Sequence, residues 1–265
     1  MNFDHYEMLS FSRDGRVLTI TMNRPELLNA VNHALHEEMA RVFFDAADDT
    51  ESDVIVLTGE GKAFSAGGDF DWLEKQARGE RVPFVHEAKS MRRIVMGLLD
   101  CAKPVIAKVN GDAMGFGASI ALLCDIIIAA DHARFADPHV KLGLVAGDGG
   151  ALIWPQLIGF AKAKHYLLTG EPIGAVEAER CNLINFAVPA DELDAFVDKY
   201  TAKLARGAQT AIRYTKSVTN IALRQLFSSV FEAGVAYEGL ATYTADFGEA
   251  VHSMLEKRRP EFTGK

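Results

Sequence analysis

Three short and almost wholly apolar runs constrain the fold of this 265-residue chain more than any other feature. They are Val54–Gly59, Pro104–Val109 and Cys124–Ala130. Continuous apolar runs of this length are typical of strands that helices cover on both faces, as in a parallel sheet. Because glycine-containing loops and helical patterns follow these runs, the sequence predicts an α/β architecture.

Other segments complete the expected core. Residues 17–22 alternate like a half-buried strand, and residues 133–136 have the pattern of a short returning strand. Helical patterns cover residues 30–47, 83–99 and 118–123. Strands and helices therefore alternate up to about residue 190.

The character of the chain changes after Pro189. Four helices are expected, over residues 191–206, 208–219, 223–242 and 247–258. Asp191 is a plausible N-cap, and Pro260 is expected to end the last helix. We therefore divide the chain into a core that carries the active site, residues 1–190, and a helical region, residues 191–265. Small residues at 233–241 favour close packing, either within the chain or against another subunit.

Composition argues against several classes of function. The net charge of −8 disfavours a nucleic-acid-binding protein, which needs a basic face. The three cysteines have no CxxC spacing, so we expect neither a disulfide framework nor a zinc site. Apart from His86 and His139, the histidines show no spacing typical of metal ligands, so no metal site is expected. The longest apolar run is far too short to span a bilayer, and we expect a cytoplasmic protein without a membrane partner.

Two loops rich in small residues are the best candidates for chemistry. The first covers residues 62–70 and the second covers residues 110–119, where it opens a predicted helix. Small residues allow a ligand to approach the backbone, and the first turn of a helix offers unpaired N–H groups. Two such groups that converge on one carbonyl oxygen would form an oxyanion hole. Neither loop has the glycine spacing of a dinucleotide-binding fingerprint.

The same loops carry a family resemblance. Asn23-Arg24-Pro25, residues 63–69, residues 103–117 with Cys124-Asp125, and the ending at residues 256–262 occur in the order and spacing of a known pattern. The chain resembles the enoyl-CoA hydratase/isomerase (crotonase) family over essentially its whole length.

The resemblance implies a fold, an assembly and a ligand. The fold would be a spiral of ββα turns with a helical C-terminal trimerisation region, and the assembly a homotrimer or a dimer of trimers. The substrate would be an acyl-CoA thioester, with coenzyme A as part of the substrate and no tightly bound cofactor. The oxyanion donors would be the N–H groups of Ala66 and Phe116. The residues implied in coenzyme A binding are Leu27, Ser65, Gly67, Gly68 and Asp69, together with Phe262 and Lys265 from a neighbouring subunit's tail.

The sequence departs from the family at the two glutamates that its hydratases use. Ser119 occupies the first of these positions and His139 the second. Asp148 follows His139 by nine residues, and this pair resembles the His–Asp pair of β-diketone carbon–carbon hydrolases in the same superfamily. We predict that His139 is a general base and that Asp148 orients it. Ser119 is expected to line the pocket.

Each of these residues also has a simpler interpretation. Asp148 precedes two glycines and could be a turn residue, and His139 could be a hydrogen-bonded core histidine. His86 could line the acyl pocket or lie on a solvated helix face. Three functions therefore stand: an acyl-CoA-processing hydratase, isomerase or hydrolase; a coenzyme A-independent β-diketone hydrolase; and a non-catalytic acyl-CoA-binding protein. A coenzyme A-binding measurement separates the second from the others.

Overall fold

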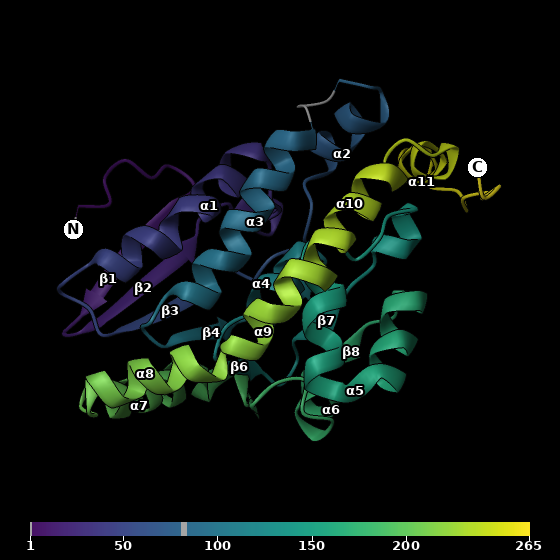
Figure 1. Ribbon diagram of the computed structural model, residues 1–265. Helices are drawn as coiled ribbons and strands as arrows, with labels where there is room; N and C mark the ends of the chain where they lie inside the picture. The colour runs from purple at the N-terminus through teal and green to yellow at the C-terminus, as the bar shows by residue number, and fades with distance from the viewer. Residues whose placement is uncertain (1, 81–83) are drawn as a thin grey trace.

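A six-stranded sheet forms the centre of the molecule (Figure 1) in the computed structural model, which describes residues 2–80 and 84–265. Its strands are β1 (Leu9–Asp14), β2 (Val17–Met22), β3 (Val54–Gly59), β4 (Val105–Val109), β6 (Ile126–Ala130) and β9 (Phe186–Val188). Strand β1 is antiparallel to β2, and every later neighbour is parallel. The predicted α/β architecture and the three apolar strands are confirmed.

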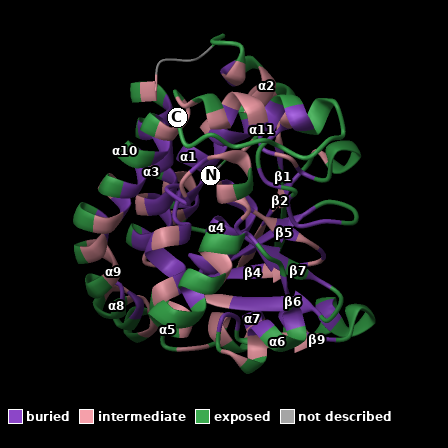
Figure 2. Cartoon of the chain, turned by 90° about the vertical axis from the view of Figure 1, so that its right-hand side faces the viewer, coloured by how far each residue is buried: buried purple, intermediate pink, exposed green. Residues whose placement is uncertain are grey.

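Both faces of the inner strands β3, β4 and β6 are buried, which explains the unbroken apolar runs. Ile55 and Leu57 of β3 belong to the main core cluster, which also contains side chains of α1 (His33–Asp48) and α3 (Phe84–Asp100). Val54 and Val56 face the other way, toward a cluster that includes Val197 of α7 (Leu193–Ala205). Figure 2 shows β4 and β6 mainly in the buried class and exposed residues on the outer surfaces of the helices.

A second sheet of short strands positions the loops that follow the main strands. It contains β5 (Ala113–Met114), β7 (Arg134–Ala136) and β8 (Ile173–Gly174). Two isolated bridges, Ser65 with Ala113 and Val31 with Gly68, extend this row to the first glycine loop. The chain thus passes from a main strand to a short strand and then to a helix, repeatedly. This path lays the two glycine loops side by side.

The remaining helical elements are η1 (Pro25–Leu27), α2 (Phe70–Ala77), α4 (Phe116–Leu122), η2 (His139–Leu142), α5 (Gly150–Thr169), α6 (Ala175–Arg180), η3 (Ala190–Glu192), α8 (Gln209–Thr219), α9 (Ile221–Leu226), η4 (Phe227–Phe231), α10 (Glu232–Ala241) and α11 (Ala245–Leu255). The helices α2, α5 and α6 were not predicted. The prediction for residues 83–99 matches α3, although Pro83 lies outside the described residues.

Residues 191–265 are mainly helical, as expected, but two boundary predictions were wrong. Asp191 lies inside η3, and the side chain at the N-cap of α7 makes no capping hydrogen bond. The last helix ends at Leu255, well before Pro260, which lies in an extended tail. Within the described residues, none of the helices is both long enough and apolar enough to cross a membrane. The division at residue 190 stays a prediction.

Candidate active site

A cavity of about 630 Å³ lies where the two glycine loops meet the helices α1, α2, α3, α10 and α11. Most of its wall is apolar and includes Phe70, Trp72, Phe84, Met91 and Phe116. Its polar lining consists mainly of the residues His36, Gln76, Glu87, His139, Lys141, Asp148, Glu238, Thr242, Ser253 and Arg258. A largely apolar cavity with a few convergent polar groups is the usual form of a small-molecule site.

The first glycine loop presents one free backbone donor to this cavity. The N–H of Ala66 donates to the carbonyl of Leu28 at 2.9 Å, so the prediction that Ala66 is an oxyanion donor needs correction. The N–H of Gly67 donates to Ser65 Oγ, and that of Asp69 donates to the carbonyl of Val31. Among the described residues, Gly68 finds no acceptor for its N–H. Gly68 is therefore the donor that the first loop offers.

The second loop presents its donor from the first turn of α4. Phe116 is the first residue of this helix, so no preceding turn supplies an acceptor for its N–H. Gly115 already donates to the carbonyl of Ala136 at 2.8 Å. Phe116 lines the cavity, as Gly68 does. The role of Phe116 as an oxyanion donor stays a prediction, and Gly68 takes the place of Ala66 as its partner.

The two loops approach so closely that side chains would not fit between them. A Cβ on Gly67, whose φ is +88°, would lie 2.8 Å from the carbonyl oxygen of Met114. A Cβ on Gly117 would lie 2.6 Å from Cβ of Ser65. Glycine at these positions therefore lets the backbones of both loops line one cavity.

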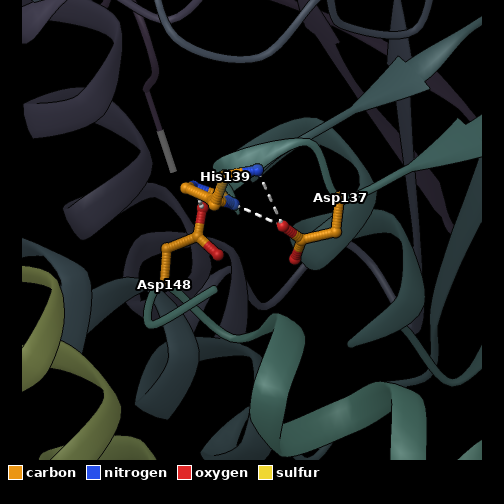
Figure 3. A group of neighbouring side chains, drawn as sticks. All are labelled: Asp137, His139 and Asp148. Atoms are coloured by element: carbon orange, nitrogen blue, oxygen red, sulfur yellow. Dashed lines mark hydrogen bonds and ion pairs between the residues drawn. The ribbon is translucent and has the colours of Figure 1, made fainter. Parts of the chain in front are cut away.

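His139 lies beside the loops with a carboxylate at each ring nitrogen (Figure 3). Its Nδ1 is 2.5 Å from Oδ1 of Asp137, and its Nε2 is 3.4 Å from Oδ2 of Asp148. The other oxygen of Asp148 accepts a hydrogen bond from Ser119 Oγ at 2.8 Å. The predicted His139–Asp148 pair is in contact, and Asp137 is a third member that the sequence analysis missed. Ser119 is fully buried and contacts Asp148, so it supports the pair from outside the cavity lining.

Burial and charge act in opposite directions on this group. Burial disfavours the imidazolium, but the carboxylates of Asp137 and Asp148 outweigh it and raise the pKa of His139 well above its usual value. Burial also opposes ionisation of Asp148, yet the neighbouring His139 and the Ser119 hydroxyl lower the pKa of this carboxyl. At neutral pH the group therefore holds a charged imidazolium beside an ionised carboxylate.

Asp137, His139 and Asp148 are also close enough together to suggest a metal site. The two carboxylates, however, contact opposite nitrogens of the ring. An ion at either nitrogen would take the place of a proton that one carboxylate already accepts. The arrangement therefore fits an imidazolium with a proton on each ring nitrogen better than a metal ion.

Comparison with known proteins shows the family of this chain. A sequence model of enoyl-CoA hydratase/isomerase matches residues 12–265. The chain belongs to the enoyl-CoA hydratase/isomerase family. It is 35% identical over 263 residues to a probable enoyl-CoA hydratase, echA8, of Mycobacterium bovis, covering 97% of this chain and 98% of the relative. It is 34% identical to the 2,3-dehydroadipyl-CoA hydratase of Escherichia coli over 97% of this chain and 99% of that protein.

A solved structure supports the same assignment. The enoyl-CoA hydratase/isomerase of Mycobacterium paratuberculosis superposes with a TM-score of 0.90 at 37% identity, covering 95% of this chain and all of that one. The crotonase fold expected from the sequence is therefore confirmed. Membership of the enoyl-CoA hydratase/isomerase family makes the chain an acyl-CoA-processing enzyme.

Several residues implied in coenzyme A binding have structural partners instead. Ser65 is fully buried, and its hydroxyl donates to the carbonyl of Asn29. Asp69 caps α2 by accepting from the N–H of Asp71, and it forms an ion pair with Arg24 at 2.9 Å. These two side chains hold the first glycine loop in its conformation.

The other implied residues are at the surface or the cavity. Gly67 and Gly68 line the cavity, and the side chain of Leu27 is about half exposed beside the first loop. Phe262 lines the cavity of its own chain, and the carbonyl of Lys265 accepts from the N–H of Ala245. The tail thus folds back over α11 in the same chain, while its predicted contact with a neighbour's coenzyme A stays a prediction.

The sequence analysis missed other cavity residues, and of its two interpretations of His86 the solvated helix face is the one that the structure supports. His36 of α1, Glu87 of α3 and Glu238 of α10 are buried and line the cavity, whereas His86 is exposed and does not. The sequence did contain a local signal for Asp137. Aspartate side chains in turns often accept a hydrogen bond from the backbone N–H two residues later. Here Asp137 accepts from the N–H of His139 at 3.4 Å. Nothing in the local pattern distinguishes His36 or Glu238 from ordinary helix residues.

Proposed function

We propose that this enzyme adds water reversibly across the α,β double bond of a 2-enoyl-CoA thioester, with Asp137, His139 and Asp148 in place of the family's glutamates. One observation carries the proposal. An acid–base group of one imidazole and two carboxylates borders the same cavity as the unoccupied N–H groups of Gly68 and Phe116.

The backbone donors would stabilise the enolate. When water adds to the β-carbon, negative charge moves to the thioester oxygen. Donation from Gly68 and Phe116 to this oxygen opposes the build-up of charge, a contribution worth about 2.7–4 kcal/mol per donor in enzymes where it has been measured. The apolar wall around the thioester strengthens this interaction by excluding water.

The proton balance follows from the protonation states of the group. Asp148, ionised and at the cavity, accepts a proton from water as the oxygen bonds to the β-carbon. His139 gives its proton to the α-carbon, which restores the thioester carbonyl. Asp148 then returns its proton to His139 across their contact of 3.4 Å. One water is consumed, and the charge of the group is the same before and after the cycle.

A hydration assay with trans-2-hexenoyl-CoA tests this proposal. We expect loss of the enoyl-thioester absorbance and a product heavier by one water. His139→Ala should lower kcat by about 10²–10⁴-fold, because a general acid–base group typically contributes this much. The affinity for saturated hexanoyl-CoA should change little. His132→Ala removes an exposed histidine and serves as the matched control.

The β-diketone hydrolase is the second candidate, favoured by the contact between His139 and Asp148. It predicts cleavage of a cyclic β-diketone without coenzyme A, assayed with the same two variants. Diketone cleavage with no binding of hexanoyl-CoA would replace the hydratase proposal. Binding of hexanoyl-CoA with no turnover of either substrate would leave a non-catalytic acyl-CoA-binding protein.

A further inference from the structure

Two buried polar side chains in the cavity have no role in the mechanism above. His36 is 2% exposed and Glu238 is 7% exposed, and both line the cavity. They come from different walls, α1 and α10. Neither ring nitrogen of His36 has a hydrogen-bond partner in the described part of the chain, and neither does Oε2 of Glu238. Buried polar groups in folded proteins are nearly always paired, so these atoms call for a partner that the protein itself does not supply.

His36 is held in place by rings rather than by hydrogen bonds. Its imidazole lies 5.6 Å from the ring of Trp72 and 5.3 Å from the ring of Phe116. Burial lowers the pKa of His36 to about 4. The ring is therefore neutral at pH 7, with one N–H donor and one acceptor nitrogen.

Glu238 lies where α10 crosses the loop before α5. A Cβ on Gly147 would lie 2.6 Å from Oε2 of Glu238, which shows how closely this carboxyl approaches the backbone beside Asp148. Burial, with the charges of Asp148, Asp137 and Glu87 nearby, raises the pKa of Glu238 to about 8 even though the His139 charge opposes this. The carboxyl is thus mainly protonated at neutral pH and can donate a hydrogen bond.

We propose, on the basis of the hydratase function above, that the acyl chain of the substrate carries neutral keto or hydroxyl groups that hydrogen-bond to His36 and Glu238. A hydrocarbon chain would displace water from the cavity and leave both side chains unpaired. A carboxylate on the acyl chain would meet the charges of Asp148 and Glu87. A neutral oxygen can accept from the Glu238 carboxyl, and a neutral oxygen can accept from or donate to the His36 imidazole, so keto or hydroxyl groups suit both side chains.

Binding of saturated thioesters tests the inference without turnover. We expect 5-oxohexanoyl-CoA and 5-hydroxyhexanoyl-CoA to bind the full-length protein about tenfold or more tightly than hexanoyl-CoA, because sites that hydrogen-bond an oxygen reject analogues that lack it. Adipyl-CoA should bind more weakly than the keto and hydroxy thioesters. Isothermal titration gives the four dissociation constants. Equal affinities for the keto, hydroxy and unsubstituted chains, or a preference for adipyl-CoA, would overturn the inference.

Variants assign the preference to the two side chains. His36→Leu and Glu238→Met should each reduce the keto-to-alkyl affinity ratio several-fold, whereas Glu238→Gln, which keeps a donor, should retain most of it. Met91→Leu alters the cavity lining at α3 without changing a polar atom and should keep the ratio. A ratio that His36→Leu and Glu238→Met both leave intact would overturn the assignment.

Turnover distinguishes this inference from the function on which it rests. If the keto thioester is preferred in binding but 5-oxo-trans-2-hexenoyl-CoA is not hydrated, the hydratase proposal fails and the acyl-group inference stands. If both enoyl thioesters are hydrated equally well and the two variants lower kcat equally on both, the side chains position water and the acyl-group inference fails. Thermal melting of each variant identifies any loss of folding.

Discussion

The ring of His139 is protonated because of its two neighbours. A histidine without partners would titrate near pH 6.5, and a catalytic rate that depends on its neutral form would rise through that pH. Here Asp137 is the largest favourable contributor to a raised pKa, followed by Asp148. The sequence led us to expect a general base that is neutral at pH 7. The structure instead provides a proton donor next to an ionised carboxylate.

The pH dependence of hydration should report this arrangement. We expect kcat/KM to be flat through neutral pH and to fall on the alkaline side, as His139 loses its proton. Asp137→Asn removes a carboxylate that favours the imidazolium, so the alkaline limb should move to lower pH. Asp131→Asn, at an exposed position, should leave it in place. An alkaline limb that does not move in Asp137→Asn would contradict the proposed charge state.

The titration of Glu238 should contribute to the pH dependence of the protein's stability. Its pKa is raised from 4.5 to about 8, chiefly by burial. Between these values the unfolded chain has lost the proton while the folded chain keeps it, so this residue makes the protein less stable as pH rises through that window. Glu238→Gln has no such titration. The melting temperature of Glu238→Gln minus that of the wild type should therefore increase from about pH 5 to about pH 8 and stay constant above that pH.

A matched substitution at the surface controls for general charge effects. Glu192 is exposed at the end of η3, and Glu192→Gln should follow the wild type at every pH. Parallel melting curves for Glu238→Gln and the wild type would show that the carboxyl is ionised in the folded protein. Calorimetric scans at a series of pH values provide the comparison.

At the scale of elements, the site depends on how the start of α5 meets β7 and η2. A Cβ on Gly150 would lie 1.9 Å from Oδ2 of Asp137. Gly150→Ala should therefore push this carboxylate away from His139 and lower kcat by about 10²-fold, the loss that a displacement of 1 Å can cause. Gly248→Ala places a Cβ in open space on α11 and should have little effect on kcat. Full activity of Gly150→Ala would mean that Asp137 is not needed in this position.

The elements themselves were largely predictable from the sequence. The strands β2 and β3 begin and end where the apolar patterns do, since a buried strand needs apolar side chains and little else. Helix α5 was missed because its pattern is broken. Pro155 lies within it, and Gly159 has a φ of +73° and non-helical geometry. The helix has too little amphipathic periodicity for residue spacing to reveal it.

The candidate site was only partly predictable, because its function depends on the direction of individual groups. Ala66 and Gly68 belong to the same glycine-rich run, and only the fold determines that Leu28 takes the N–H of Ala66 and leaves that of Gly68 free. Glu238 is about 90 residues from Asp148 in the sequence. It reaches the cavity because Gly234, one turn earlier on α10, lets that helix approach Gly147. Such contacts depend on packing that a single sequence does not encode locally.

At the scale of the whole molecule, the C-terminal helices are anchored to the core by polar contacts. Arg92 of α3 forms an ion pair with Glu232 of α10 at 2.5 Å, and Lys216 of α8 contacts Asp125 at 2.6 Å. The glycines of α10, Gly234 and Gly239, face the chain's own core, whereas Ala233 and Ala236 are exposed. The outward side of the same region nevertheless leaves large apolar side chains exposed, among them Tyr214, Val218, Tyr237, Leu240 and Tyr243. Apolar surface of this kind is typical of a subunit contact.

We therefore expect a trimer, or a multiple of a trimer, in solution. This expectation rests on the resemblance to the crotonase family given in the sequence analysis. From a chain mass of 28.9 kDa, light scattering coupled to gel filtration should give about 87 kDa or twice this value. Leu240→Glu places a charge on the exposed side of α10 and should lower the mass toward that of a single chain. Val176→Glu makes the same change on α6, outside the C-terminal helices, and should not. A wild-type protein that elutes as a monomer at micromolar concentration would refute the assembly, and Phe262 would then serve only the cavity of its own chain.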